Sequence, residues 1–273
     1  MKYNTVLSIA GADNSGGAGI QADIKSVSAC GCYAMTALTA VAVQNTQGVT
    51  DVFALPVKVL EEQIESCLSD IGADAVKIGM LHSSEVINVV KDAIVKYDIK
   101  NVVLDPVMVS TSGHKLIEDE AIATLKSVLI SKARIITPNI PEAEILLGKK
   151  ISQQSQLPAL ARELSAMYST CGNKVSVFLK AGHLVDDDLI DVFYNAETDE
   201  AINLKSKRVY TKNTHGTGCT LSSALASFLA KGLPLNDAAR SAKDYINGAI
   251  VAGKDYQIGH GFGPVCHFWN LWK

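Results

Sequence analysis

Two glycines flank Thr217 in the segment THGTGCTLSSALASFLA, residues 214–230, and strong helix formers follow at once. The backbone N–H groups of Gly216, Thr217 and Gly218 would form an anion hole that the helix dipole reinforces. A phosphoryl group in transfer needs such a hole. Cys219 falls in the first helical turn, where the pKa of a thiol is expected to fall. Its alternative is a small core residue, and its place beside an anion hole favours a functional thiol.

A second glycine cluster stands near the start of the chain, in AGADNSGGAGIQADIKS at 10–26. Glycines between a strand and a helix let the backbone approach a ligand and can hold an anion at the helix N-terminus. The pattern matches neither the P-loop nor the dinucleotide-binding motif. Two interpretations therefore stay open for this cluster: a ligand loop, and a tight strand-to-helix turn.

The elements that position these clusters alternate between short β-branched runs and amphipathic stretches. We expect strands at 5–11, 37–45, 75–79, 101–107, 133–139 and 175–182. We expect helices at 57–71, 84–97, 118–129, 217–231 and 235–252, and an antiparallel extension at 188–195 and 201–210. Apolar strands separated by helices predict an α/β fold with a mostly parallel sheet covered on both faces.

Polar and glycine residues interrupt the pattern where the predicted strands end. They are Gly11, Asp13, Gln44, Asn45, Gly79, Asp105, Asn139 and Lys180. In an open parallel sheet, ligands bind along the edge formed by the carboxyl ends of the strands. The sequence therefore predicts an enzyme whose site lies along that edge.

Composition narrows the class of protein. The 273 residues are 48% hydrophobic and 19% charged, with a formal net charge of −3, so they indicate a globular chain without a basic field for nucleic acid. The first residues are too short an apolar run for a signal peptide, and no uncharged stretch is long enough for a membrane span. The six scattered cysteines favour reduced thiols in a cytoplasm. We find no linker or repeat and interpret residues 1–273 as a single domain.

Several motifs occur in a fixed order: GADNSGGAGIQADIK, VQNT at 43–46, KIGM at 77–80, DPVM at 105–108, TPNIPE at 137–142, LKAGH at 179–183 and NTHGTGCT at 213–220. Together they resemble the hydroxymethylpyrimidine kinase/phosphomethylpyrimidine kinase family of thiamin biosynthesis, in the ribokinase-like superfamily. The resemblance extends to GHGFGPVCHF at 259–268 and so covers essentially the whole chain. It implies a three-layer sandwich, ATP and Mg2+ as cofactors, and two successive phosphorylations of hydroxymethylpyrimidine.

The resemblance also implies roles for the phosphate-binding and catalytic residues. Cys219 corresponds to the general base, at a position where most of the superfamily has aspartate, and Gly216 and Gly218 to the anion hole. Thr217, Lys180 and Asn139 correspond to the groups near the nucleotide phosphates. Asp105 and Glu142 would organise Mg2+, partly through water, because magnesium gives up its hydration reluctantly. Glu142 has an alternative as a glutamate that stabilises a helix start.

For the substrate, the resemblance points to polar contacts from Gly11, Asp23 and Gln44, and to Met80 and Val107 on either side of the ring. The amide of Gln44 offers one donor and one acceptor, which a 4-aminopyrimidine complements. Relatives in the family use pyridoxal or pyridoxine, so a vitamin B6 kinase is the rival function. A catalytically silent nucleotide-binding regulator is a third, and the intact catalytic positions argue against it.

Two positions depart from the family pattern, and the oligomeric state follows from resemblance alone. His114 stands where an aspartate is common, and Ala181 where a glycine is common. Relatives without a large lid tend to be dimers, and no lid insertion is evident here, so we expect a homodimer. We expect His82, His183, His215, His260 and His267 to be structural or surface residues, because their spacing is not that of metal ligands.

Overall fold

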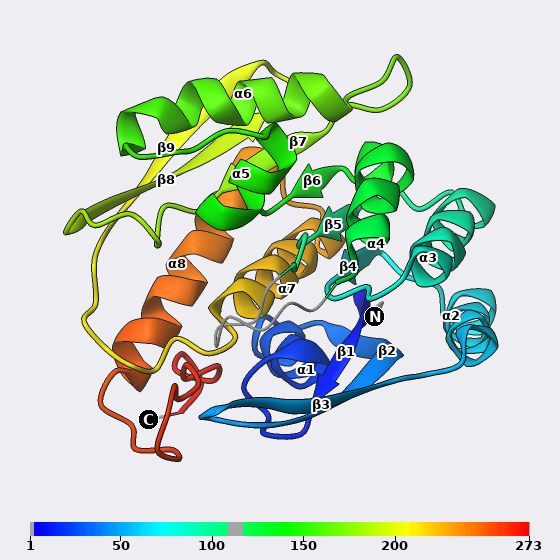
Figure 1. Ribbon diagram of the computed structural model, residues 1–273, viewed down its shortest axis with the longest axis horizontal. Coiled ribbons are helices and arrows are strands. Elements are labelled where there is room, and N and C mark those ends of the chain that lie inside the picture. The colour runs from blue at the N-terminus through cyan, green and yellow to red at the C-terminus, as the bar shows by residue number, and fades with distance from the viewer. Residues whose placement is uncertain (1–2, 109–116, 273) are drawn as a thin grey trace.

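The computed structural model describes residues 3–108 and 117–272. Within these ranges the strands form one nine-stranded sheet in the order β3-β2-β1-β4-β5-β6-β7-β8-β9. Helices cover both faces of the sheet and give three layers (Figure 1). Helices α2 to α6 pack on one face, and α1, α7 and α8 on the other. The predicted α/β three-layer class is confirmed.

The bounds of the elements follow. The strands are β1 (Thr5–Asp13), β2 (Tyr33–Asn45), β3 (Gly48–Ala54), β4 (Ala75–Ile78), β5 (Val102–Leu104), β6 (Ile135–Ile136), β7 (Ser176–Leu179), β8 (Asp188–Asn195) and β9 (Glu200–Lys207). The helices are α1 (Gly19–Ala29), α2 (Val57–Asp70), α3 (Ser84–Lys96), α4 (Asp119–Thr124), α5 (Ile140–Leu147), α6 (Leu157–Tyr168), α7 (Thr217–Ala230) and α8 (Leu235–Gly253). A π-helical turn (Leu125–Leu129) and a 3₁₀ turn (Ile130–Lys132) extend α4.

Alternation along the central strands builds the two faces of the core. On β5, Val102 and Leu104 face one layer of helices and Val103 faces the other, and all three are fully buried. Successive side chains of a strand point to opposite faces, so a strand buried on both faces must be apolar throughout. This burial explains why the central strands are recognisable in the sequence as uninterrupted apolar runs.

The order of the strands reverses beside β1. The chain places β2 on one side of β1 and β4 on the other, and both pairs are parallel. A crevice forms at such a switch point, outside the carboxyl ends of the strands. The loops after β1 and β4 therefore lie at the position where a doubly wound sheet binds its ligand.

The edges of the sheet are antiparallel at both ends, whereas the sequence predicted this only for the β8–β9 end. Strand β3 was missed, and it pairs with β2 in a hairpin from Tyr33 to Ala54. The outer half of β2 is covered on one face only, so Val41 and Val43 are exposed, at 37% and 51%. The expectation that Gln44 ends a buried strand is wrong for this reason, and Gln44 is half-buried.

A segment near the C-terminal end of the chain crosses back over the carboxyl edge of the sheet. The Phe262 N–H donates to the carbonyl of Thr46 at 2.7 Å, and the His215 N–H donates to the carbonyl of Gly263 at 3.0 Å. This segment thus joins the β2–β3 turn to the loop before α7. Among the helices described here, none is sufficiently long and apolar to cross a membrane.

Candidate active site

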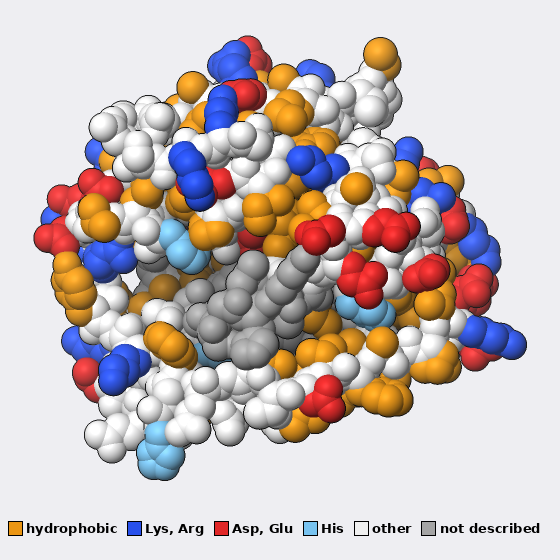
Figure 2. All heavy atoms as spheres, viewed as in Figure 1, with side chains coloured by type: hydrophobic (Ala, Val, Ile, Leu, Met, Phe, Trp, Pro, Cys, Tyr) orange, Lys and Arg blue, Asp and Glu red, His pale blue; other side chains and the backbone are white. Residues whose placement is uncertain are grey.

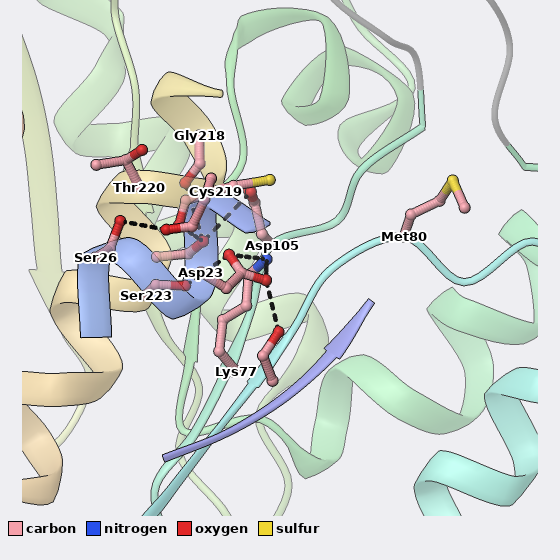
Figure 3. Close-up of polar contacts among 12 residues, drawn as sticks. Asp23, Ser26, Lys77, Met80, Asp105, Gly218, Cys219, Thr220 and Ser223 are labelled. Atoms are coloured by element: carbon pink, nitrogen blue, oxygen red, sulfur yellow. Dashed lines mark hydrogen bonds and ion pairs between the residues drawn. The ribbon is translucent and has the colours of Figure 1, made fainter. Parts of the chain in front are cut away.

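Four of the predicted residues meet at the start of α7. A Cβ on Gly218 would lie 3.2 Å from Asp105 Oδ2 and 3.4 Å from Lys180 Nζ. Lys180 Nζ donates to Asp105 Oδ1 at 3.0 Å, and its backbone forms a parallel bridge to Asn139. Glycine at 218 therefore lets the first turn of α7 approach a buried carboxylate and an ammonium closely. Figure 3 shows Asp105, Gly218 and Cys219 together at this edge.

In the Asp105–Lys180 pair, one carboxylate oxygen of Asp105 is well bonded, and the other faces the first turn of α7. Asp105 Oδ1 also accepts from Thr137 Oγ1 at 2.9 Å, while among the described residues Oδ2 receives one long contact, 3.5 Å from Ser222 Oγ. The side chain of Lys180 is 15% exposed. Burial opposes the charge on Lys180, but Asp105 and then Glu142 outweigh burial and raise the pKa of its ammonium. The pair is charged and faces the glycine turn.

Asn139 and Glu142 form a reciprocal cap at the start of α5. The Glu142 N–H donates to Asn139 Oδ1 at 2.9 Å, and the Asn139 N–H donates to Glu142 Oε2 at 2.8 Å. The alternative that we set beside a metal role was a glutamate that stabilises a helix start, and the structure adds the reciprocal bonds of a capping box. Burial raises the pKa of Glu142 to about 7; Lys180 lowers it and Asp105 raises it. A divalent cation would stabilise the ionised form of a carboxylate whose pKa is raised in this way.

The turn before α7 can be built only from glycine at one position. Gly216, the N-cap of α7, has φ of +79°, and a Cβ there would overlap the carbonyl oxygen of Gly17. The first turn of a helix has N–H groups without carbonyl partners inside the helix, and here they start beside Asp105 and Lys180. The Thr217 N–H donates to the carbonyl of Thr214 at 3.3 Å, and the anion hole stays a prediction.

The prediction that the helix start lowers the pKa of Cys219 is wrong. Burial raises the pKa of the thiol to about 11; Lys77 lowers it, and Asp23 and Asp105 raise it further. Desolvation of the thiolate and two neighbouring carboxylates outweigh one lysine and the helix start. Cys219 is a protonated thiol at neutral pH in the ligand-free protein.

Lys77 is a buried residue that the sequence analysis did not single out. It is fully buried at 0% exposure, and its Nζ donates to both oxygens of Asp23 at 2.9 Å. Asp23 also accepts from Ser8 Oγ at 2.5 Å and Ser223 Oγ at 2.7 Å. Burial opposes the charge on Lys77, but Asp23 and then Cys219 raise the pKa of its ammonium. Asp23, expected near the substrate, thus has both oxygens engaged inside the protein (Figure 3).

Of the residues expected to bind the substrate ring, Gly11, Met80 and Val107 lie in or just after central strands, whereas Gln44 lies on the β2–β3 hairpin. Gly11 and Met80 are close together, since a Cβ on Gly11 would lie 2.6 Å from Met80 Cε, and Val107 lies in the loop after β5. Figure 3 shows Met80 apart from the Asp23–Lys77 cluster, on the loop that leaves β4. Gln44 lies beside the first glycine cluster, and its backbone N–H donates to Asn14 Oδ1 at 2.8 Å. The side-chain roles of these residues stay predictions.

The amides of the first glycine cluster point at a carboxylate of the chain itself. Asp13 accepts from the N–H groups of Ser15, Gly17 and Ala18 at 2.8, 3.1 and 2.7 Å. These bonds are those of a tight strand-to-helix turn. Of the two interpretations of residues 10–26, the turn therefore describes how the backbone of this cluster is used.

The two departures from the family pattern have different outcomes. His114 lies outside the described residues. Ala181 is fully buried, and its N–H donates to Asp191 Oδ1 at 2.7 Å, so its methyl group packs in the core beside Lys180. Among the described residues no cluster of three His, Cys, Asp or Glu side chains could hold a metal. A site made of Asp105 and Glu142 would thus leave most positions of the ion to water and phosphate.

The face that carries this edge has no uniform charge. Figure 2 shows basic and acidic side chains interspersed over this view of the molecule. A fold of this type, with a lysine and two carboxylates at the glycine-rich start of a helix, defines an ATP-dependent kinase of the ribokinase-like class.

The chain belongs to the phosphomethylpyrimidine kinase family, whose model matches residues 13–266. It is 42% identical over 267 residues to a hydroxymethylpyrimidine/phosphomethylpyrimidine kinase of Rhizobium meliloti, covering 98% of both chains. It is 40% identical to the enzyme so named in Escherichia coli, covering 100% of both chains. It spans about half, 52%, of a thiamine biosynthesis bifunctional protein of Geobacter sulfurreducens at 42% identity.

Solved structures of two kinds resemble this one. An ADP complex of Bacillus subtilis pyridoxal kinase has a TM-score of 0.86 at 34% identity, covering 97% of this chain and 98% of that one. A phosphomethylpyrimidine kinase of Clostridium difficile has a TM-score of 0.75 at 41% identity, covering 90% and 99%. The fold is therefore shared by kinases named for two different heterocycles.

Proposed function

We propose that the chain transfers the γ-phosphate of ATP to 4-amino-5-hydroxymethyl-2-methylpyrimidine, and then a second phosphate to the monophosphate, in thiamin biosynthesis. The observation that carries the proposal is the approach of Gly218 to both Asp105 and Lys180, within 3.2 and 3.4 Å of a Cβ position. It brings backbone N–H groups, an ammonium and a carboxylate to one point. Phosphoryl transfer depends on such positioned charges. The names of the curated relatives support the choice of substrate.

Lys180 and the turn at Gly216, Thr217 and Gly218 would bind the phosphate that is transferred. In the loose transition state, negative charge lies on the oxygens of that phosphate. A partly exposed ammonium beside the helix start can reach them, and Asn139 lies next to Lys180 across the strand bridge. Groups held in this way before ATP binds would need little reorganisation during the reaction, which supports the proposal.

Asp105 and Glu142 would hold Mg2+, partly through water. The fit rests on burial: both carboxylates are at most 5% exposed, and burial, which the charge of Lys180 only partly offsets, raises the pKa of Glu142. When bound, the ion would offset phosphate charge. The capping box with Asn139 leaves Glu142 Oε1 for this role, because Oε2 accepts the backbone N–H.

Cys219 would take the proton of the attacking hydroxyl. As the substrate oxygen forms its bond to the γ-phosphorus, the bond between that phosphorus and the β–γ bridging oxygen breaks and ADP leaves. The hydroxyl proton passes to the Cys219 thiolate. A pKa of about 11 for the thiol makes the thiolate rare at neutral pH, but a loose transition state tolerates late proton transfer.

The test of this role is Cys219→Ala, which should lower kcat by about 10²–10⁴, the usual effect of losing a positioned base. The KM for ATP should change little, because Lys180 and the backbone turn remain. Matched assays with Cys171→Ala, which alters an exposed thiol, control for alkylation and oxidation effects. A kcat within about fivefold of the unmodified protein would contradict the base role.

Phosphorylation of pyridoxal is the second candidate function, favoured by the pyridoxal kinases among the similar structures. Gln44 should discriminate, because pyridoxal has no amino group to complete its hydrogen-bonded pair. Gln44→Leu should lower kcat/KM for the pyrimidine by about 10- to 100-fold, the scale of 1–3 kcal/mol for an unmatched polar group. The value for pyridoxal should change far less. Equal losses would limit Gln44 to supporting its loop, and pyridoxal preferred by the unmodified protein would favour the rival.

We further propose that residues 1–273 act as one domain in the cytoplasm and as a homodimer. Free cysteines in the described chain support the compartment. The edge strand β3 supports pairing, because Phe53 is 70% exposed and Val43 on β2 is 51% exposed. Light scattering at assay concentration tests the dimer, and a monomer would contradict it.

A further inference from the structure

Asp13 accepts hydrogen bonds from two segments of the chain, the turn after β1 and the loop before α7. Oδ1 accepts from the N–H and the hydroxyl of Ser15, at 2.8 and 2.6 Å. Oδ2 accepts from the N–H groups of Gly17 and Ala18, and lies 2.8 Å from His215 Nε2. The side chain is 1% exposed. Burial opposes its charge, but the bonds from His215, Ser15 and Ala18 outweigh burial and hold the pKa of Asp13 well below its usual range.

The charge on Asp13 fixes the direction of the bond to His215. An ionised carboxylate only accepts hydrogen bonds, so His215 Nε2 must carry the proton and donate. The bond spans 202 residues of sequence and joins the turn after β1 to the loop before α7. It therefore links the two glycine-rich turns that sequence analysis singled out.

Steric contacts lock the same two turns together. A Cβ on Gly17 would overlap the imidazole of His215, and a Cβ on Gly216 would overlap the carbonyl oxygen of Gly17. Both glycines are thus needed for the close approach of one turn to the other. The His215 ring lies between the Asp13 carboxylate and the first residue of the anion hole.

We propose that Asp13 and His215 form a positioning pair that sets the place of the anion hole at Gly216, Thr217 and Gly218. The internal carboxylate of Asp13 fills the first glycine turn, so the transferred phosphate binds at the second turn alone. The bond to His215 then holds the second turn in register with Lys180 and Asp105. This inference rests on the proposed function, since the anion hole is taken to bind the γ-phosphate.

The test separates the hydrogen bond from the size of the ring. His215→Phe keeps a ring and removes the donor, while His215→Gln restores an N–H donor that can reach Asp13. A shift of the hole by about 1 Å lowers rate by about 10²-fold, so His215→Phe should lower kcat by about 10- to 100-fold. The KM for ATP should stay within about threefold, and His215→Gln should recover most of the loss. His260→Phe makes the same change at an exposed histidine and should leave kcat within about twofold.

A second pair of variants reaches the same contact from the other side. Gly17→Ala leaves every bonding group in place and pushes only on the His215 ring, because the three atoms nearest to the new Cβ all belong to that ring. It should lower kcat as His215→Phe does. Adding the smaller donor His215→Asn to Gly17→Ala should restore part of the activity. Gly17→Ala and the double variant keep the inference testable if His215→Phe fails to fold.

Amide hydrogen exchange provides a readout that needs no substrate. His215→Phe should speed exchange in peptides covering 14–18 and 214–220, and His215→Gln should not. If these changes appear in a protein that phosphorylates no pyrimidine, the pair stands and the proposed substrate fails. Unchanged exchange together with kcat within about twofold in His215→Phe would overturn the pair. Equal losses in His215→Phe and His215→Gln would overturn it too, because the donor would then be irrelevant.

Discussion

Two buried aspartate–lysine pairs flank Cys219, and they differ in what surrounds them. Asp23 and Lys77 are both 0% exposed, and four side-chain contacts engage the two oxygens of Asp23. Asp105 and Lys180 are 2% and 15% exposed. Oδ2 of Asp105 faces the glycine turn with one long contact in the described part of the chain.

The difference separates a fully enclosed pair from a pair of the same residue types that we propose to bind a ligand. In the Asp23–Lys77 pair, hydrogen bonds from α7 and β1 replace the hydration of the carboxylate, so the pair joins α1, β1, β4 and α7. In the Asp105–Lys180 pair, the ammonium keeps access to the edge where phosphate would bind. A buried pair is costly to break from one side, whereas a partly open pair can exchange partners.

Lys77→Met removes the positive charge of the fully buried pair, and we expect it to have the largest effect of these variants, on the free energy of unfolding. It leaves the Asp23 carboxylate buried without a counter-charge, and such losses cost about 3–5 kcal/mol of unfolding free energy. Urea unfolding followed by circular dichroism measures the change. Lys91→Met, on the surface of α3, is the matched control and should change unfolding by less than about 1 kcal/mol. A stable Lys77→Met protein would mean that Asp23 readily takes up a proton and that the pair is dispensable.

Lys180→Met should act mainly on the reaction. Removing one group that stabilises a transition state lowers kcat by about 10²–10³. The loss of unfolding free energy should be less than half of that in Lys77→Met, because water and Thr137 still reach Asp105. Kinase assays and urea unfolding on the same preparations give both numbers. A stability loss as large as that of Lys77→Met, with unchanged kcat, would reverse the assignment of the two pairs.

Glu142→Gln sharpens the comparison through pH. The pKa of Glu142 is about 7 in the folded protein against an ordinary value of 4.5, so the folded state binds the extra proton. Unfolding free energy is therefore lost as pH rises from about 4.5 to 7, by up to about 3 kcal/mol at 1.36 kcal/mol per unit. Glu142→Gln should not show this loss of unfolding free energy. Its stability relative to the unmodified protein should therefore be greater at pH 8 than at pH 5. It should also need more Mg2+ for half-maximal rate.

The control for that prediction is Glu144→Gln, on the same helix but in an exposed pair with Lys150. Its pH dependence should match that of the unmodified protein near neutral pH. If the unfolding free energy of Glu142→Gln depends on pH between 5 and 8 as that of the unmodified protein does, the pKa of Glu142 is not raised. An unchanged magnesium dependence would leave Glu142 with its capping role alone.

Much of the fold was predictable because the central strands are buried on both faces. The capping box at Asn139 was also readable, since its pattern is local. The features that the sequence did not predict depend on residues far away in the chain. Lys77 and Asp23 are 54 residues apart, and no local signal shows that the lysine of one strand meets the aspartate of a helix. The prediction of a lowered pKa for Cys219 failed for the same reason. The helix start is a local feature, whereas burial and the two carboxylates that raise the pKa come from tertiary contacts.

The return of the chain over the carboxyl edge affects the order in which the protein is made. Thr46, His215 and residues 262–263 meet at one place, although β1 and β2 leave the ribosome long before them. Domains fold largely as units, and contacts distant in sequence form late. A nascent chain that lacks Phe262 and Gly263 has neither the partner of the Thr46 carbonyl nor that of the His215 N–H. We therefore expect the carboxyl edge of the sheet to be completed only after residues 262–263 have been synthesised and have folded back over it.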